Sequence, residues 1–281
     1  MKKNINYSLA SVLALLFISA LPSYSQNIPA APRPGFTREE LKAAKANPKY
    51  YTINPASVKI TLMETAQEPD MSYVKLQEDR DPAATPVSLD SIINTAQKVW
   101  AIVEANQPIA NIETKYATAY PEGVTSAAQL SGWSKPISHT YGFSAQNGFG
   151  STMINSQYKV IFTYGGNYKG KGKYLTAIAV IPVINMVGSG YKFSMAADAP
   201  DSTLMNVGTD TDPVAAIQLK LAWKITTVLK EDNGTSMYYM QGDGDYEEMA
   251  SPFGAKEVKL EDMKSGAALL NPEKVFDVPA R

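Results

Sequence analysis

AAIQLKLAWKITTVLK, residues 215–230, is the stretch that decides the fold class of this chain. Every second side chain, beginning at Ala215, is apolar except Thr227, whereas the positions between them include Lys220 and Lys224. A β-strand separates two such sets because its side chains alternate with a period of two, and the 3.6-residue period of a helix would mix them. The stretch therefore predicts a long strand with one buried face and one face toward water.

The sequence after this strand predicts a hairpin. Asn233-Gly234 is the pair best suited to a tight turn in which both central residues have positive φ, and a partner strand would follow at 235–241. Other alternating or apolar stretches, separated by turn signals, lie at 57–63, 157–164, 173–181 and 190–197. The chain is therefore expected to be mainly β: an antiparallel β-sandwich, or an open barrel, of about seven or eight strands.

Two segments predict helices. Between Ser88 and Asn106 the apolar residues recur every three or four positions, Ser88 can cap the first turn, and Asn106 suits the end of the last turn. We expect one amphipathic helix here, packed against the sheet. Thr37 and Glu40 form a capping box that predicts a second, shorter helix over 38–46.

The first 25 residues have the pattern of a secretory signal peptide. Lys2 and Lys3 precede an apolar run at 8–21, and small residues precede a cut before Gln26. The run is shorter than the roughly 20 residues that a membrane span needs, and no later stretch is apolar enough to be one. We expect the cleaved protein to be exported, into the periplasm or out of the cell, with no transmembrane segment.

The charge and the cysteine content exclude several classes of function. The 281 residues carry 26 Lys and Arg against 27 Asp and Glu, and this balance predicts no general affinity for nucleic acid or acidic membranes. The sequence has no cysteine, so disulfides, thiol catalysis, thiolate zinc sites and iron–sulfur clusters are excluded. An exported chain without cysteine is typical of a bacterial periplasm.

Composition divides the chain into four parts. Residues 1–25 are the predicted signal peptide, and residues 26–86, with several prolines and a charged stretch, are expected to form a partly disordered N-terminal extension. Residues 87–250 hold the predicted helix and the β-sandwich. Residues 251–281 lose the alternation and are expected to form a C-terminal tail.

Catalysis by histidine would have to use His139, the single histidine of the sequence. One histidine cannot form a cluster of histidine metal ligands. A Ser-His-Asp triad would also need this residue, but it lies in a predicted strand, and no Gly-rich nucleophile elbow occurs in the chain. We therefore expect His139 to be a structural residue.

Two acidic loops are candidate metal or acid–base sites. Asp210 and Asp212 lie in one predicted loop, and Asp243 and Asp245 lie in another, each beside glycine. Carboxylates on such loops could converge on calcium, the one metal ion that the sequence suggests, or act as an acid–base pair. Neither loop has the spacing of an EF-hand. The alternative is that the acidic residues keep these turns solvated.

The loop at 165–174 is the candidate binding site. Its ligand-binding candidates are Tyr168, Lys169, Lys171, Lys173 and Tyr174. Glycine between the lysines lets a ligand approach the backbone, lysine attracts phosphate or carboxylate, and tyrosine offers a flat face with a polar tip. The loop lacks the spacing of a phosphate-binding loop. It is predicted to contact an anionic glycan, a lipid head group or a partner protein; the alternative is a flexible, solvated connection.

These features favour a non-catalytic binding or structural protein with no cofactor, whose partner is an envelope glycan, lipid or protein. One alternative is an envelope polysaccharide hydrolase that uses Asp and Glu. Another alternative is an interaction module stabilised by calcium.

Overall fold

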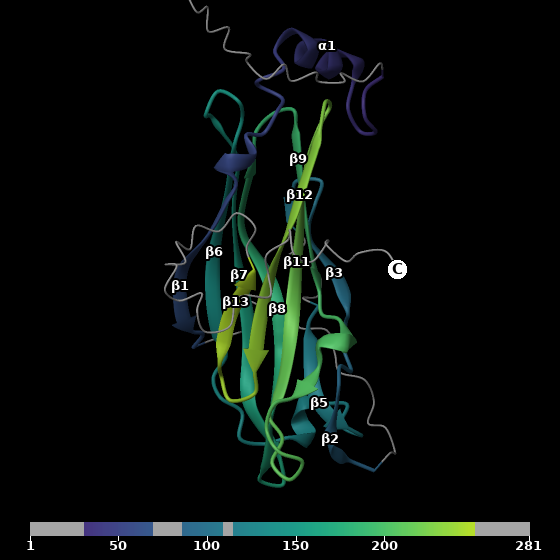
Figure 1. The fold of residues 1–281 in the computed structure, drawn as a ribbon, viewed down its shortest axis with the longest axis vertical. Coiled ribbons are helices and arrows are strands. Elements are labelled where there is room, and N and C mark those ends of the chain that lie inside the picture. Colours follow the sequence, from purple (N-terminus) through teal and green to yellow (C-terminus); the bar gives the residue numbers. More distant parts are fainter. Residues whose placement is uncertain (1–30, 70–85, 109–114, 251–281) are drawn as a thin grey trace, which may run out of the picture.

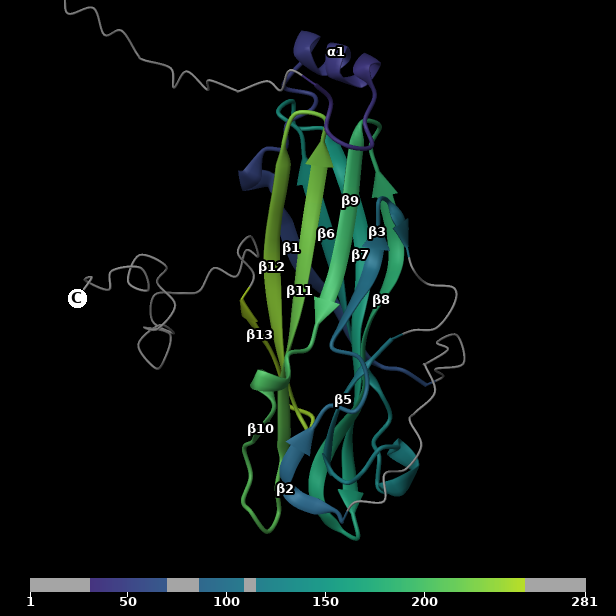
Figure 2. The ribbon, with the colours of Figure 1, turned by 90° about the vertical axis from the view of Figure 1, so that its right-hand side faces the viewer.

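The structure, a computed structural model, describes residues 31–69, 86–108 and 115–250. In this part of the chain two antiparallel sheets pack face to face into a long, narrow β-sandwich (Figure 1, Figure 2). The structure is 58% strand and 9% helix, which confirms the predicted mainly β sandwich. The predicted signal peptide at 1–25 and the predicted tail at 251–281 lie outside the described residues.

The strands are divided between the two sheets. The strands of the first sheet are β1 (Lys59–Gln67), β2 (Ser88–Ile93), β5 (Ala117–Glu122), β6 (Ile137–Gln146), β7 (Thr152–Tyr168) and β8 (Lys171–Val187). The strands of the second sheet are β3 (Val99–Glu104), β4 (Gln107–Pro108), β9 (Tyr191–Asp198), β10 (Met205–Asn206), β11 (Ala215–Thr227), β12 (Glu231–Gln241) and β13 (Tyr246–Ala250).

Neighbouring strands follow the order β1-β6-β7-β8-β5-β2 in the first sheet. The order in the second sheet is β13-β12-β11-β9-β3-β4, and β10 pairs with β11 outside this path. The helical elements of the described chain are α1 (Arg38–Ala46) and the short 3-10 helices η1 (Pro55–Ser57), η2 (Ala127–Gln129) and η3 (Asp201–Thr203).

β11 lies in the middle of the second sheet and has the two faces predicted for it. Its inward side chains are at most 2% exposed: Ile217, Leu219, Leu221, Trp223 and Ile225. Lys224, between the last two, is exposed. The inward row packs onto the first sheet, where the indole of Trp223 meets the ring of Phe143 edge-on, with 5.2 Å between ring centres. Each buried side chain of this kind contributes about 1.5–3 kcal/mol, so the row anchors the core.

The hairpin after β11 turns earlier than predicted. Asn233-Gly234 lies inside β12, and the turn is formed by 228–229, between Thr227 and Lys230, which share a backbone hydrogen bond of 2.8 Å. Gly234 pairs with Trp223, and a Cβ at this glycine would overlap the indole ring. The predicted turn is wrong because this glycine makes room for an aromatic side chain instead of bending the chain.

The helix α1 closes the end of the sandwich over this turn (Figure 1, Figure 2). It spans the predicted residues, and its capping box is present: Thr37 N donates to Glu40 Oε2 at 2.7 Å, and Glu40 N donates to Thr37 Oγ1 at 3.1 Å. Leu41 and Ala44 are buried against Val228, which is itself fully buried. An apolar turn is stable here because α1 covers it.

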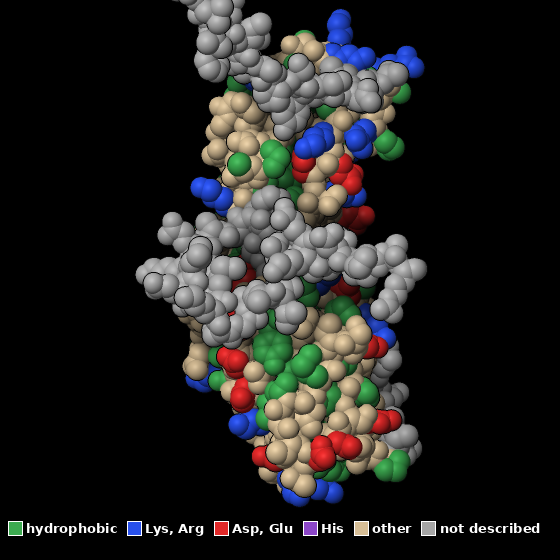
Figure 3. Space-filling view, in the orientation of Figure 1, with side chains coloured by type: hydrophobic (Ala, Val, Ile, Leu, Met, Phe, Trp, Pro, Cys, Tyr) green, Lys and Arg blue, Asp and Glu red, His purple; other side chains and the backbone are tan. Residues whose placement is uncertain are grey.

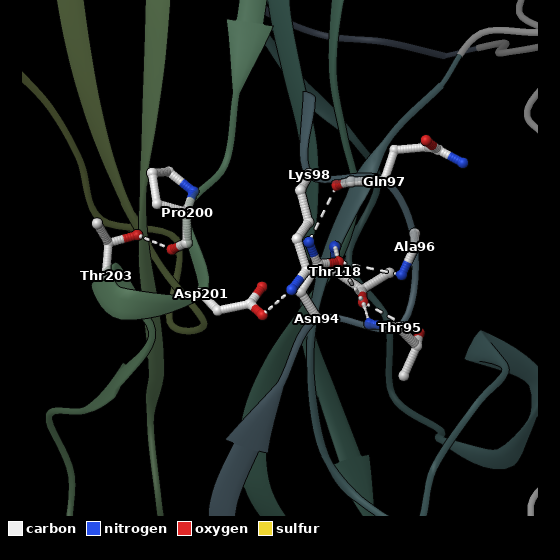
Figure 4. Close-up of polar contacts among 9 residues, drawn as sticks. All are labelled: Asn94, Thr95, Ala96, Gln97, Lys98, Thr118, Pro200, Asp201 and Thr203. Carbon is white, nitrogen blue, oxygen red and sulfur yellow. Dashed lines mark hydrogen bonds and ion pairs between the residues drawn. The ribbon is translucent and has the colours of Figure 1, made fainter. Parts of the chain in front are cut away.

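The helix predicted over 88–106 is wrong, because this segment forms β2 in the first sheet and β3 in the second. The side chain of Asn94 holds the crossing between the sheets in place (Figure 4). Asn94 Oδ1 accepts hydrogen bonds from Ala96 N at 3.1 Å and from Thr118 N at 3.0 Å. Asn94 Nδ2 donates to Gln97 O at 3.0 Å. Where a break separates two strands, the apolar positions of the second strand are out of phase with those of the first. Taken together, these positions then recur every three or four residues, as they do in an amphipathic helix.

Part of the segment predicted as an N-terminal extension belongs to the sandwich. β1 forms the edge of the first sheet and pairs with β6 along its whole length. Ile60 of β1 is buried in the core. A register shift between Leu62 and Glu64 places an extra residue in β1, and such a bulge protects an edge strand from pairing with another chain.

We expect Trp223→Lys to destabilise the protein severely. The substitution places an unpaired charge on the inner face of β11, at a cost of about 3–5 kcal/mol against a typical total stability of about 5–15 kcal/mol. Lys224→Trp is the matched control, since position 224 is exposed, and it should change the free energy of unfolding by less than about 1 kcal/mol. Chemical denaturation of both variants checks this. Equal destabilisation would show that the register of β11 is wrong.

Asn94→Ala should lower the free energy of unfolding by about 2 kcal/mol, because the buried N–H of Thr118 loses its acceptor. Lys98→Ala is the control. Lys98 forms an ion pair with Asp201 close to the same crossing (Figure 4), but both side chains are largely exposed, so the loss should stay below about 0.5 kcal/mol. Urea denaturation compares the variants, and a larger loss for Lys98→Ala would contradict the role given to Asn94.

Candidate functional site

The candidate binding loop is the end of a hairpin formed by β7 and β8, each of 17 residues. The strands extend as far as Tyr168 and Lys171, which pair with each other. Lys169 and Gly170 form the turn, with φ of 53° and 82°. Positive φ at both central residues is typical of a type I′ turn, which fits the twist of a hairpin. The loop expected over 165–172 is therefore a two-residue turn between two strands.

The glycines of this hairpin make room for aromatic side chains of the protein. A Cβ at Gly166 would overlap the ring of Trp133, and a Cβ at Gly172 would lie 2.5 Å from the ring of Tyr174. Gly172 also has a φ of 78°, a conformation that favours glycine. Close packing of the chain against itself therefore accounts for both glycines.

Neighbouring segments hold the hairpin on two sides. On one side Asn167 N donates to Ser131 O at 2.8 Å, and Ser131 N donates to Asn167 O at 2.9 Å. On the other side Lys173 N donates to Pro213 O at 2.8 Å. The end of the hairpin is thus tied to the rest of the fold by backbone hydrogen bonds, which limits its conformational freedom.

Four of the five residues predicted to bind a ligand reach the surface. The four are Tyr168, Lys169, Lys171 and Lys173, and we call them the lysine tip. Lys169 Nζ lies 5.0 Å from the centre of the Tyr168 ring, which is a cation–π contact. Tyr174 is fully buried, and its hydroxyl donates to Leu89 O at 2.9 Å. Burial raises the pKa of Tyr174 to about 12, so this residue serves the core.

The first predicted acidic loop, with Asp210 and Asp212, lies beside the hairpin. Asp212 Oδ1 accepts a hydrogen bond from Gly172 N at 2.8 Å, and Asp210 is exposed. The structure therefore brings this loop and the lysine tip to the same end of the sandwich.

The second predicted acidic loop is the turn between β12 and β13. Asp243 Oδ1 accepts a hydrogen bond from Asp245 N at 3.2 Å, and Asp245 Oδ2 accepts one from Gln241 Nε2 at 3.1 Å. Gly165 N donates to Gly242 O at 2.9 Å, so this turn borders β7. Within 31–69, 86–108 and 115–250 the structure groups no three His, Cys, Asp or Glu side chains as a metal site would.

The lysine tip presents three positively charged side chains on a hairpin whose backbone is held by its neighbours. Lys169, Lys171 and Lys173 take part in none of the ion pairs formed among the described residues. Ammonium groups of this kind attract phosphate, sulfate or carboxylate groups. The geometry of the lysine tip therefore supports binding of an anionic group.

His139 lies in the core of the sandwich. Its ring stacks on Tyr246 with 3.6 Å between ring centres, and its Nδ1 lies 2.9 Å from Thr65 Oγ1. Desolvation lowers the pKa of His139 to about 4, so the ring is neutral at pH 7. Nε2 is buried and has no hydrogen-bond partner in the part of the chain that the structure describes.

Two pairs of tyrosines, all buried except the partly buried Tyr246, join the sheets through the core. The hydroxyls of Tyr158 and Tyr238 lie 2.8 Å apart, and so do those of Tyr141 and Tyr246. Burial raises the pKa of all four tyrosines above the ordinary value of 10, so they stay protonated at neutral pH. The sequence gives no signal for this pairing beyond the abundance of tyrosine, because the partners lie on strands far apart in the chain.

A partly buried ion pair lies on the opposite side of β6 from His139. Glu68 Oε1 accepts hydrogen bonds from Ser138 Oγ and from Lys159 Nζ, each at 2.6 Å. The group joins the end of β1 to β6 and β7. The sequence carries no motif for it, because 91 residues separate Glu68 and Lys159.

Comparison with known proteins finds no family model, no curated protein and no solved structure that matches the chain. The fold and the lysine tip together define an elongated antiparallel β-sandwich with a positively charged hairpin at one end. Among the described residues no helix has the length and apolar character of a membrane span.

The stability of the protein should fall as the pH decreases from 7 to 5. In the unfolded chain His139 has its ordinary pKa of about 6.5, whereas in the fold its pKa is about 4, so the unfolded state binds the proton first. The contribution of this pKa difference to the free energy of unfolding is fully present above pH 6.5, and it is lost as the pH falls toward 4. We expect a loss of about 1–2 kcal/mol by pH 5.

Urea denaturation at several values between pH 5 and pH 7 measures this dependence. His139→Gln should remove most of it, because the variant has no histidine left in the chain. The same slope in the variant would show that other groups cause the pH dependence.

Proposed function

We propose that this chain is an exported, non-catalytic binding protein that contacts an anionic partner through the lysine tip. The observation that carries the proposal is the presentation of three exposed lysines, without ion pairs among the described residues, on a turn whose two strands are held by their neighbours. A turn that is already ordered loses little conformational entropy when it binds.

The position of the lysine tip supports this proposal. The hairpin ends at one extremity of the elongated sandwich, at the opposite end from α1 (Figure 1, Figure 2). A partner can therefore reach these side chains without contact with the faces of either sheet. Tyr168 adds a half-buried aromatic ring beside the charges, and such a ring can stack on a sugar or on another planar group.

The proposed partner follows from the chemistry of lysine. An ammonium group is a compact charge that binds phosphate, sulfate or carboxylate without demanding one fixed geometry. Export to the periplasm or the cell exterior, which the pattern of residues 1–25 predicts, would place the protein among envelope components. We therefore propose an anionic envelope glycan as the partner.

Lys169→Gln, Lys171→Gln and Lys173→Gln together should weaken retention of the cleaved chain on immobilised dextran sulfate by at least about tenfold, because the variant removes the charge of the lysine tip. The same variant should lose its partner in a pull-down from envelope extract. All three side chains are exposed, so folding should be unchanged, and the melting temperature verifies this.

The matched control removes three exposed lysines from elsewhere in the fold: Lys59→Gln, Lys135→Gln and Lys224→Gln. It should keep most of the affinity for dextran sulfate. Equal losses in the two variants would mean that total charge and not the lysine tip determines binding. Unchanged binding of the lysine-tip variant in both assays would refute the proposal.

A further inference from the structure

α1 closes the end of the sandwich that lies opposite the lysine tip, and it runs across the long axis of the molecule (Figure 1, Figure 2). Its inner side packs on the turn between β11 and β12, where Leu41 and Ala44 are buried. Its outer side therefore forms part of the end surface of the protein.

One exposed flank of α1, next to its buried side, is basic, whereas the exposed Glu39 lies on the outer side. Arg38, Lys42 and Lys45 are spaced four and three residues apart, which places them on one side of a helix, and all three are exposed. Lys49, shortly after the helix, is exposed as well. The ion pairs found within the described ranges involve none of these four residues. Figure 3 shows Lys and Arg side chains gathered at this end of the molecule.

An exposed aromatic side chain lies beside this basic surface. Phe149, in the turn between β6 and β7, is 58% exposed, and it is the one aromatic residue among the exposed large hydrophobic side chains of the described chain. The turn is fixed next to Lys49, because Gly148 N donates to Lys49 O at 2.9 Å. The fold therefore holds this ring at the surface beside Lys49, where it is not part of the core.

We infer that this end of the protein docks on an anionic lipid bilayer. The residues that make the contact, which we call the basic end, are Arg38, Lys42, Lys45, Lys49 and Phe149. The four positive side chains lie over the phosphate groups of the lipids, and the phenylalanine ring enters the interface between head groups and acyl chains.

A bilayer fits the basic end better than an acidic protein or a nucleic acid does. The charges follow one exposed flank of a helix at the extremity of the molecule, where an extended charged plane can reach them. Peripheral membrane contacts combine Lys and Arg with a few apolar side chains, and the basic end supplies both. Because α1 uses its apolar side to cover Val228, the helix itself stays outside the acyl chains and the contact is reversible and sensitive to salt.

The net charge of the whole chain does not prevent this contact. The formal charge is −1, and this value predicts no general affinity for acidic membranes. Residues 31–50, however, hold five basic and two acidic side chains. The potential of an anionic membrane falls off within a Debye length of about 8–10 Å. An elongated molecule that contacts the membrane by one end keeps most of its acidic residues beyond that distance.

Flotation with lipid vesicles tests the inference on the cleaved chain. The two kinds of vesicle contain phosphatidylcholine alone or phosphatidylcholine with phosphatidylglycerol. We expect binding to the anionic vesicles only, and a loss of at least about tenfold between roughly 50 mM and 300 mM salt. Each basic residue near an anionic surface strengthens binding about fivefold. Arg38→Gln, Lys42→Gln and Lys45→Gln together should therefore weaken binding by at least about tenfold.

The matched control removes three exposed lysines that belong to neither the basic end nor the lysine tip: Lys98→Gln, Lys115→Gln and Lys135→Gln. These substitutions remove the same number of charges, and they should change vesicle binding by less than about twofold. No binding of the unmodified protein to anionic vesicles, or equal losses in the two variants, overturns the inference. Either result is distinct from failure of the proposed function, because retention on dextran sulfate depends on the lysine tip.

Phe149 provides a second readout that does not depend on charge. Phe149→Ala should weaken binding to anionic vesicles several-fold, because it removes the apolar part of the contact. Phe149→Trp should retain binding, and brominated lipids should quench its fluorescence. Trp100 and Trp223 are buried. The partly buried Trp133 packs over Gly166 in the hairpin at the opposite end, so the unmodified protein should show little quenching. A bound Phe149→Trp variant that shows no added quenching would overturn the placement of this ring in the interface.

Discussion

The contact between the inner face of β11 and the aromatic residues of the first sheet is the interaction on which the rest of the structure depends. Trp223 shows how strongly this contact constrains the chain. Its indole packs on Phe143 of the opposite sheet and over Gly234 of the neighbouring strand β12. Any larger residue opposite the indole would overlap it, so the register of the hairpin is fixed. That register places the turn at the end of the sandwich, where α1 covers it.

The parts of the fold that could be predicted are those whose signal is local. The period of two in β11 and the capping box of α1 depend on neighbouring residues, and both elements are present in the structure. The predicted helix over 88–106 failed because its break is fixed by Asn94 and Thr118, which lie far apart in the sequence. The predicted turn at Asn233-Gly234 failed for a similar reason, since a tryptophan on another strand determines where that glycine lies.

In the candidate site, too, local sequence predicts some features, and tertiary contacts alone determine the others. Exposure of Lys169, Lys171 and Lys173 could be predicted, because lysine alternating with glycine rarely forms a core. The burial of Tyr174 could not be predicted, since its hydrogen bond to Leu89 joins residues 85 positions apart. Glycines that suggested access to a ligand instead accommodate aromatic rings of the fold. Local composition therefore identifies the charge at the tip, and only the tertiary structure identifies the rigidity that makes it a defined surface.

The cover that α1 places on the turn of the β11–β12 hairpin has a consequence for the order of folding. Nine residues are too few for a helix to be stable alone in water, so α1 depends on its contact with Val228. The contact joins residues nearly 190 positions apart, and such distant pairs form late. Synthesis of the chain starts at the N-terminus. The helix therefore leaves the ribosome well before the hairpin on which its stability depends.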